Sequence, residues 1–215
     1  MKNLAILFLA ITLSACGVAQ KAQYSALEKV GVHKRDILVD RIEKTTETQE
    51  ETKEQFKSAY EELAELIKVD DKGLEKKYKK MAKAVEKSEE KAEELEQRIQ
   101  SVDSVANALF DEWQEELSQY QSTSLRKTSE ANLLTTKKRY AKIHRTMTES
   151  HAKVEPVLKV LQDNTLYLKH NLNARAVTSL SNEVIVIEDK VKNLIQQMEA
   201  SINESKTFVS AMQNK

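Results

Sequence analysis

The chain has 215 residues, and its 34 basic and 34 acidic side chains give a formal net charge of zero. This balance excludes a general electrostatic attraction to nucleic acid or to anionic lipid, so we expect no nucleic-acid partner. Charged residues make up 32% of the chain, whereas glycine occurs 3 times and proline once. A composition with so few helix breakers predicts an all-α protein built from long helices.

The N-terminal segment has the parts of a secretory signal. Lys2 precedes an apolar run over residues 4–13, and the small residues Ser14 and Ala15 follow it. The run is much shorter than the about 20 residues that a membrane-spanning helix needs. We therefore expect residues 1–15 to be a signal peptide rather than a membrane span.

Cys16 is the only cysteine in the chain, and the stretch Leu13-Ser14-Ala15-Cys16 resembles the lipobox of bacterial lipoproteins. The resemblance implies that a signal peptidase cuts before Cys16, after a diacylglyceryl group has joined the thiol. Fatty acids such as palmitate would then hold the mature chain on a membrane, since more than one acyl chain gives stable anchoring. The alternatives are an ordinary secretory signal with an incidental cysteine and a free N-terminal helix.

Gly17 bears on which membrane would receive the anchor. In proteobacterial lipoproteins, an aspartate after the lipidated cysteine usually retains the protein in the inner membrane. By that resemblance, Gly17 acts in sorting and implies the inner leaflet of the outer membrane, with the protein facing the periplasm.

Residues 16–23 are polar and small, and we expect them to tether the lipid to a helical domain over residues 24–215. The first helix is predicted over residues 24–69. Gly31 should kink it, because glycine in a helix costs about 1 kcal/mol relative to alanine. Residues 70–73, Asp-Asp-Lys-Gly, form the clearest break before the next helix.

The second predicted helix, over residues 74–120, has the strongest periodicity. The residues expected to form its packing seam are spaced alternately four and three residues apart over more than five heptads. This spacing predicts coiled-coil-like packing. The seam consists of Leu74, Tyr78, Met81, Val85, Ser88, Ala92, Leu95, Ile99, Val102, Ala106, Leu109 and Trp113.

Two more helices are predicted, after polar turns at residues 121–124 and 171–173. Pro156 interrupts the third helix, because an interior proline loses a backbone hydrogen bond and clashes with the turn before it. We expect a kink there, since the apolar spacing continues through the proline. The last helix again shows steps of three and four: Val177, Leu180, Val184, Ile187, Val191, Leu194 and Met198.

The four segments are similar in length, and the turns between them are short, which places consecutive helices antiparallel. We therefore predict an elongated, antiparallel up-down-up-down four-helix bundle with coiled-coil-like heptad packing. At 1.5 Å per residue, helices of about 40 to 50 residues span about 60 to 75 Å.

The waist of this predicted bundle is poor in apolar volume. Folding the chain back at each turn brings Gln49, Lys91, Lys153 and Asn193 to one level, with Thr45, Thr52, Ser88 and Ala92 around it. A polar layer of this kind favours a role in fixing the register of the helices. The alternatives are a cavity and a hinge.

The lipobox, the long heptads and the scarcity of glycine together resemble a group of uncharacterised bacterial lipoproteins classed as a domain of unknown function. The resemblance covers the whole chain. It implies an all-helical, lipid-anchored protein and carries no activity with it.

Residues that carry catalytic or metal chemistry form no recognisable constellation. His33, His144, His151 and His170 do not pair one helical turn apart, and none follows a glutamate by three residues. The three glycines cannot build a phosphate-binding loop. We therefore predict no catalytic, cofactor or metal site, and an enzyme is the least favoured hypothesis.

The favoured hypothesis is a non-enzymatic, lipid-anchored periplasmic protein. Its long helix faces would bind another envelope protein or a second copy of the chain. The alternative is a carrier that shelters a lipid or another apolar ligand between its helices at the waist.

Overall fold

The computed structural model describes Tyr24 and residues 31–68 and 73–213. These residues are helical with short connections and contain no strand, which confirms the predicted all-α class. None of their helices is both long and apolar enough to cross a membrane. In chain order the elements are α2 (Lys34–Leu66), α3 (Leu74–Glu116), the 3₁₀ turn η1 (Leu117–Gln119), α4 (Thr123–His151), α5 (Val154–His170), α6 (Ala174–Ser179) and α7 (Ser181–Gln213).

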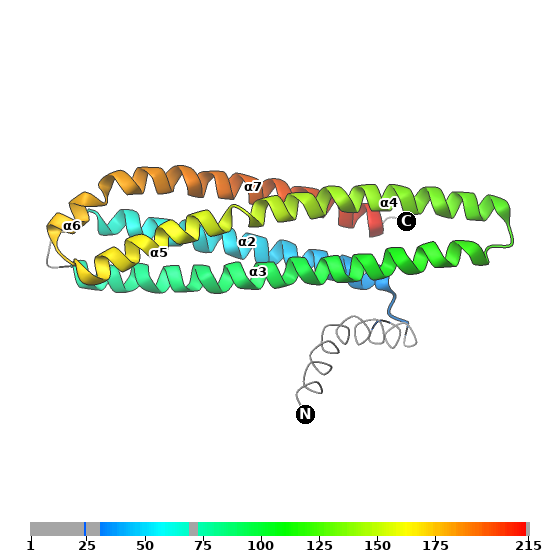
Figure 1. The fold of residues 1–215 in the computed structure, drawn as a ribbon, viewed down its shortest axis with the longest axis horizontal. Coiled ribbons are helices and arrows are strands. Elements are labelled where there is room, and N and C mark those ends of the chain that lie inside the picture. Colours follow the sequence, from blue (N-terminus) through cyan, green and yellow to red (C-terminus); the bar gives the residue numbers. More distant parts are fainter. Residues whose placement is uncertain (1–23, 25–30, 69–72, 214–215) are drawn as a thin grey trace, which may run out of the picture.

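The long helices lie lengthwise beside one another in an elongated molecule (Figure 1). α2 contacts α3 and α7, α4 contacts α3 and α7, and α5 packs against the same two helices. Two ion pairs show that α2 and α3 run antiparallel. Lys34 Nζ lies 2.9 Å from Glu112 Oε1, and Lys91 Nζ lies 2.6 Å from Glu51 Oε2.

The core follows the predicted apolar pattern closely in the last helix. Every apolar position predicted there, from Val177 to Met198, is buried. The buried face of α3 is broader than predicted, because Ala84, Val105 and Phe110 are buried beside the seam. Since α3 contacts α2, α4 and α5, it needs a wider apolar face than a two-helix seam.

The prediction of one helix over residues 24–69 is wrong. Gly31 has a φ of 85°, a left-handed conformation that glycine adopts without the steric cost of a Cβ. α2 begins only at Lys34 and ends at Leu66. Gly31 therefore separates the helical Tyr24 from α2 instead of kinking a continuous helix.

The kink predicted at Pro156 is a break, and this prediction is also wrong. α4 ends at His151, and α5 begins at Val154, so Pro156 lies in the first turn of a new helix. The fixed φ of proline suits a first turn, and its missing N–H would have no partner within the helix there. A further break, which the apolar spacing did not indicate, separates α6 from α7 at Leu180.

Candidate functional site at the polar waist and the helix break

The residues of the predicted lipid-attachment site lie outside the part of the chain that the structure describes. They are Leu13, Ser14, Ala15, Cys16 and Gly17. The predicted boundaries of the signal peptide and the tether fall in the same region.

Tyr24 shows where the chain enters the helical domain. The residue is only 1% exposed. Arg41 Nη1 donates hydrogen bonds to Tyr24 Oη at 2.8 Å and to the Ser101 carbonyl at 2.7 Å, and Tyr24 Oη lies 3.2 Å from Ser104 Oγ. The Arg41 guanidinium also lies 5.4 Å from the centre of the ring, a cation–π contact. Tyr24 is thus fixed between α2 and α3, at a level that lies several residues after the start of α2 and several residues before the end of α3.

The centre of the waist is the side-chain amide of Gln49, which is fully buried. Gln49 Nε2 donates to Ser150 Oγ and to Ser201 Oγ, each at 3.0 Å. The Ser201 hydroxyl lies 3.4 Å from Gln49 Oε1 and donates to it. One side chain therefore links α2, α4 and α7, and the amide finds its partners in the protein interior, as a buried polar group must.

Hydroxyl side chains fill the layers around Gln49. Thr45, Thr52 and Ser88 are buried and donate to carbonyls one turn earlier in their own helices, at 2.7 to 2.9 Å. Thr52 also lies 3.4 Å from the Lys91 carbonyl on α3, which confirms that these two residues share a level. The polar waist is thus occupied by hydrogen-bonded side chains around Gln49.

The amide of Gln49 gives a test of the waist. Gln49→Leu keeps most of the side-chain volume but removes the acceptor of Ser201, so we expect the free energy of unfolding to fall by about 1 to 3 kcal/mol. Gln197→Leu, an exposed change of the same kind on α7, should stay within about 0.5 kcal/mol. Urea denaturation measures both. Equal midpoints for the two variants would mean that the Gln49 network does not stabilise the fold.

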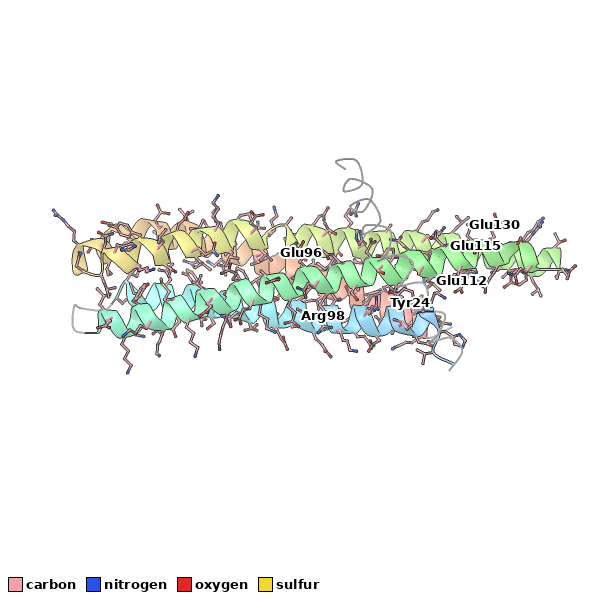
Figure 2. The ribbon with its side chains drawn as sticks, turned by 60° about the horizontal axis from the view of Figure 1, so that its bottom comes forward. Tyr24, Glu96, Arg98, Glu112, Glu115 and Glu130 are labelled. Carbon is pink, nitrogen blue, oxygen red and sulfur yellow. The ribbon has the colours of Figure 1, made fainter. Side chains whose placement is uncertain are left out.

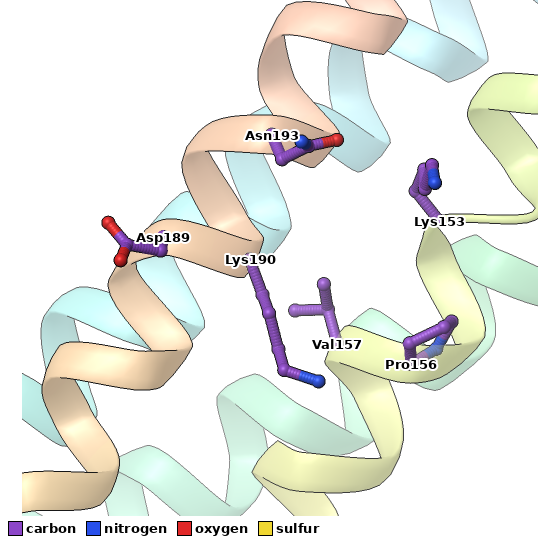
Figure 3. A pocket seen from close by; sticks show the side chains of 6 residues that line it. All are labelled: Lys153, Pro156, Val157, Asp189, Lys190 and Asn193. Atoms are coloured by element: carbon purple, nitrogen blue, oxygen red, sulfur yellow. The ribbon is translucent and has the colours of Figure 1, made fainter.

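A pocket of 320 Å³ opens beside the α4–α5 break, between α5 and α7 (Figure 3). Lys153 and Asn193, which we expected at one level, both line it. In Figure 3, Lys190 extends toward Val157, whereas Asp189 points away from the pocket. Val157 is 2% exposed and forms an apolar floor. Four of the other five lining residues are polar or charged, and the pocket is open to solvent.

A second polar cluster, which sequence reasoning did not identify, joins α3 to α4. Tyr140 Oη donates to Asp103 Oδ1 at 3.2 Å, and His144 Nε2 lies 3.6 Å from the same oxygen. Burial of Tyr140, with the Asp103 charge and hydrogen bond beside it, raises the pKa of its phenol. The hydroxyl therefore stays protonated and remains a donor. No group of three or more metal-ligating side chains occurs in the described ranges.

Comparison with protein families gives a match over residues 23–212, to the family described as "Protein of unknown function (DUF2959)". The chain belongs to the DUF2959 family. The predicted kinship with an uncharacterised family is thereby confirmed. No curated protein and no solved structure matches the chain.

The DUF2959 match covers the candidate site in the helical domain but not the predicted lipid-attachment site. It includes Tyr24, Gln49 and the pocket beside Val157. It begins after Cys16, so membership describes the helical domain and leaves lipid attachment to be tested on its own.

Proposed function

We propose that this DUF2959 protein is a lipid-anchored helical protein of the bacterial envelope. In this proposal Cys16 carries the lipid, and Gly17 directs the chain to the inner leaflet of the outer membrane, where it faces the periplasm. The helical domain acts there as a non-enzymatic interaction or structural module.

The observation that carries the proposal is the lipobox at residues 13–16 followed by a short connection to a buried residue. Cys16 and Tyr24 are eight residues apart, which limits the tether to about 30 Å when fully extended. Because Tyr24 is held between α2 and α3 by Arg41 and Ser104, the membrane would lie close to this part of the helices.

We interpret the helices as an up-down-up-down four-helix bundle in which α4 with α5 and α6 with α7 each form one leg. The ion pair of Lys34 with Glu112 supports this topology at one end. Gln213 Nε2, at the end of α7, donates to Glu43 Oε1 near the beginning of α2 at 3.2 Å. An even number of legs returns the end of the chain to the end where it began.

The second candidate function is a carrier for a lipid or another apolar ligand, and the pocket beside Val157 favours it. The hydrogen-bonded side chains that fill the waist around Gln49 favour the interaction module, because a carrier needs apolar space between its helices. The lining lysines Lys153 and Lys190 suit the polar end of an amphiphile rather than its chain.

In-cell photocrosslinking combined with fractionation tests the two candidates. A photoreactive residue in place of the exposed Leu166 on α5 should give discrete protein adducts in the outer-membrane fraction, and the same residue at Gln197 is the matched control. Lipid extraction of the purified protein, followed by mass spectrometry, should give no stoichiometric lipid beyond the anchor. A bound lipid that is lost on Val157→Asp would instead establish the carrier.

A further inference from the structure

The end of the α3–α4 hairpin, residues 113–132, extends beyond the other helices (Figure 1). We name this segment the projecting hairpin. The first residue of α2, Lys34, pairs with Glu112, so α2 does not accompany α3 past that level. On the other side, the last turns of α7 lie beside Tyr140, where Phe208 packs edge to face on the tyrosine ring with centroids 6.5 Å apart.

The core-facing positions of both helices continue into the projecting hairpin, where Leu117 is buried within the hairpin itself but others are exposed among the described residues. Leu125 lies eleven residues before Thr136, which is about three turns and therefore the same face of α4. Thr136 is 2% exposed because the bundle covers it, whereas Leu125 is 60% exposed. On the α3 side, Trp113 is half-buried and donates from Nε1 to Ser129 Oγ at 2.8 Å, and Tyr120 is 40% exposed.

The two arms of the projecting hairpin carry opposite charges. Within the hairpin, the end of α3 has Glu115 and Glu116 and no basic residue, and Figure 2 marks Glu115 there. The start of α4 has Arg126 and Lys127, followed by Glu130. Within the described parts of the chain, Glu115, Glu116, Arg126 and Lys127 take part in no ion pair.

We propose that the projecting hairpin is a self-association surface whose partner is the hairpin of a second copy. A two-fold axis would bring the acidic arm of each copy against the basic arm of the other, so that every favourable pair forms twice. The two hairpins together would restore a four-helix cross-section and cover Leu125 and Tyr120. Residues 113–132 carry three acidic and two basic side chains, so no net positive charge favours docking on an anionic membrane.

Self-association would make a second copy of the chain the partner of the interaction module. Only this role, and not the dimer itself, rests on the proposed function. Because the surface is small, we expect a weak and reversible dimer. On a membrane, the common plane would raise the effective concentration of the two copies.

Charge reversal tests the proposal with the full-length Cys16→Ser chain in solution, so lipid attachment is not required. Sedimentation velocity over a range of concentrations should show a monomer–dimer equilibrium. Glu115→Lys with Glu116→Lys gives both arms of residues 113–132 a net positive charge, and Arg126→Glu with Lys127→Glu gives both a net negative charge. Each double variant alone should dimerise at least about tenfold more weakly, because like charges then face each other.

Mixing the two double variants supplies the decisive measurement. A net-positive and a net-negative hairpin are complementary, so the mixture should dimerise more strongly than either variant alone. Lys83→Glu with Lys87→Glu, exposed changes on α3 far from the hairpin, should leave the equilibrium unchanged. Circular dichroism confirms that all variants are folded. A monomer at every concentration, or a dimer insensitive to both reversals, would overturn the proposal, whether or not Cys16 proves to be lipidated.

Discussion

Palmitate labelling of this protein should stop when Cys16 is replaced by serine. The serine hydroxyl cannot form the thioether that carries the diacylglyceryl group, and Cys16 is the only thiol in the chain. We expect Cys16→Ser to leave an unprocessed precursor or a soluble species in place of an anchored protein. Metabolic labelling with a clickable palmitate analogue, followed by gel fluorescence, measures this directly.

Gly17→Asp is the matched comparison for this experiment. It leaves Cys16 in place, so the label should remain, but the protein should shift from the outer to the inner membrane fraction. If wild type and Cys16→Ser were labelled equally, the anchor proposed at Cys16 would be wrong, although the helical domain described by the family match would be unaffected.

The largest loss of stability is expected from shortening the core side chains of α3. Leu95 is fully buried and Ile99 is 8% exposed. Leu95→Ala and Ile99→Ala should each lower the free energy of unfolding by about 2 to 5 kcal/mol, with Ile99 at the lower end, because each removes apolar contacts and leaves a cavity. For a domain of this size, each kcal/mol lowers the midpoint of thermal unfolding by about 2 to 4 °C.

Glu90 provides the control on the same helix. It is exposed on the outer face of α3, so Glu90→Ala should change stability by no more than about 0.5 kcal/mol. Thermal melts followed by circular dichroism compare the three variants. Indistinguishable melts would show that burial along α3 does not follow the heptad.

Those parts of the fold that depend on local periodicity could be predicted from the sequence. The positions from Val177 to Met198 repeat at the spacing of a helix face, and a helix that packs along its whole length buries that face wherever its neighbours lie. The position of Pro156 was also informative. Its consequence was underestimated, because whether a proline kinks or ends a helix depends on the tertiary contacts of the flanking turns.

The partners of individual polar side chains could not be predicted, because they depend on how the helices are aligned in three dimensions. The sequence predicts the level of Gln49 to within a few turns, but it does not identify the partners Ser150 and Ser201. A shift of one residue rotates a helical side chain by about 100°, so approximate levels cannot assign hydrogen bonds. The contact of Tyr140 with Asp103 was missed for the same reason. The lipobox, in contrast, is a linear motif, so lipid attachment at its cysteine can be predicted without knowledge of the fold.

The coincidence of the α4–α5 break with the polar waist affects how the molecule opens. Helical order propagates along a continuous backbone and stops where the hydrogen-bonded ladder is interrupted, here between His151 and Val154. The segment between this break and the break at Leu180, which is α5 with α6, can therefore unfold as a unit while α4 and the continuous α7 remain intact. In native-state hydrogen exchange, the backbone amides of α4 and those of α5 would form two groups with separate opening free energies.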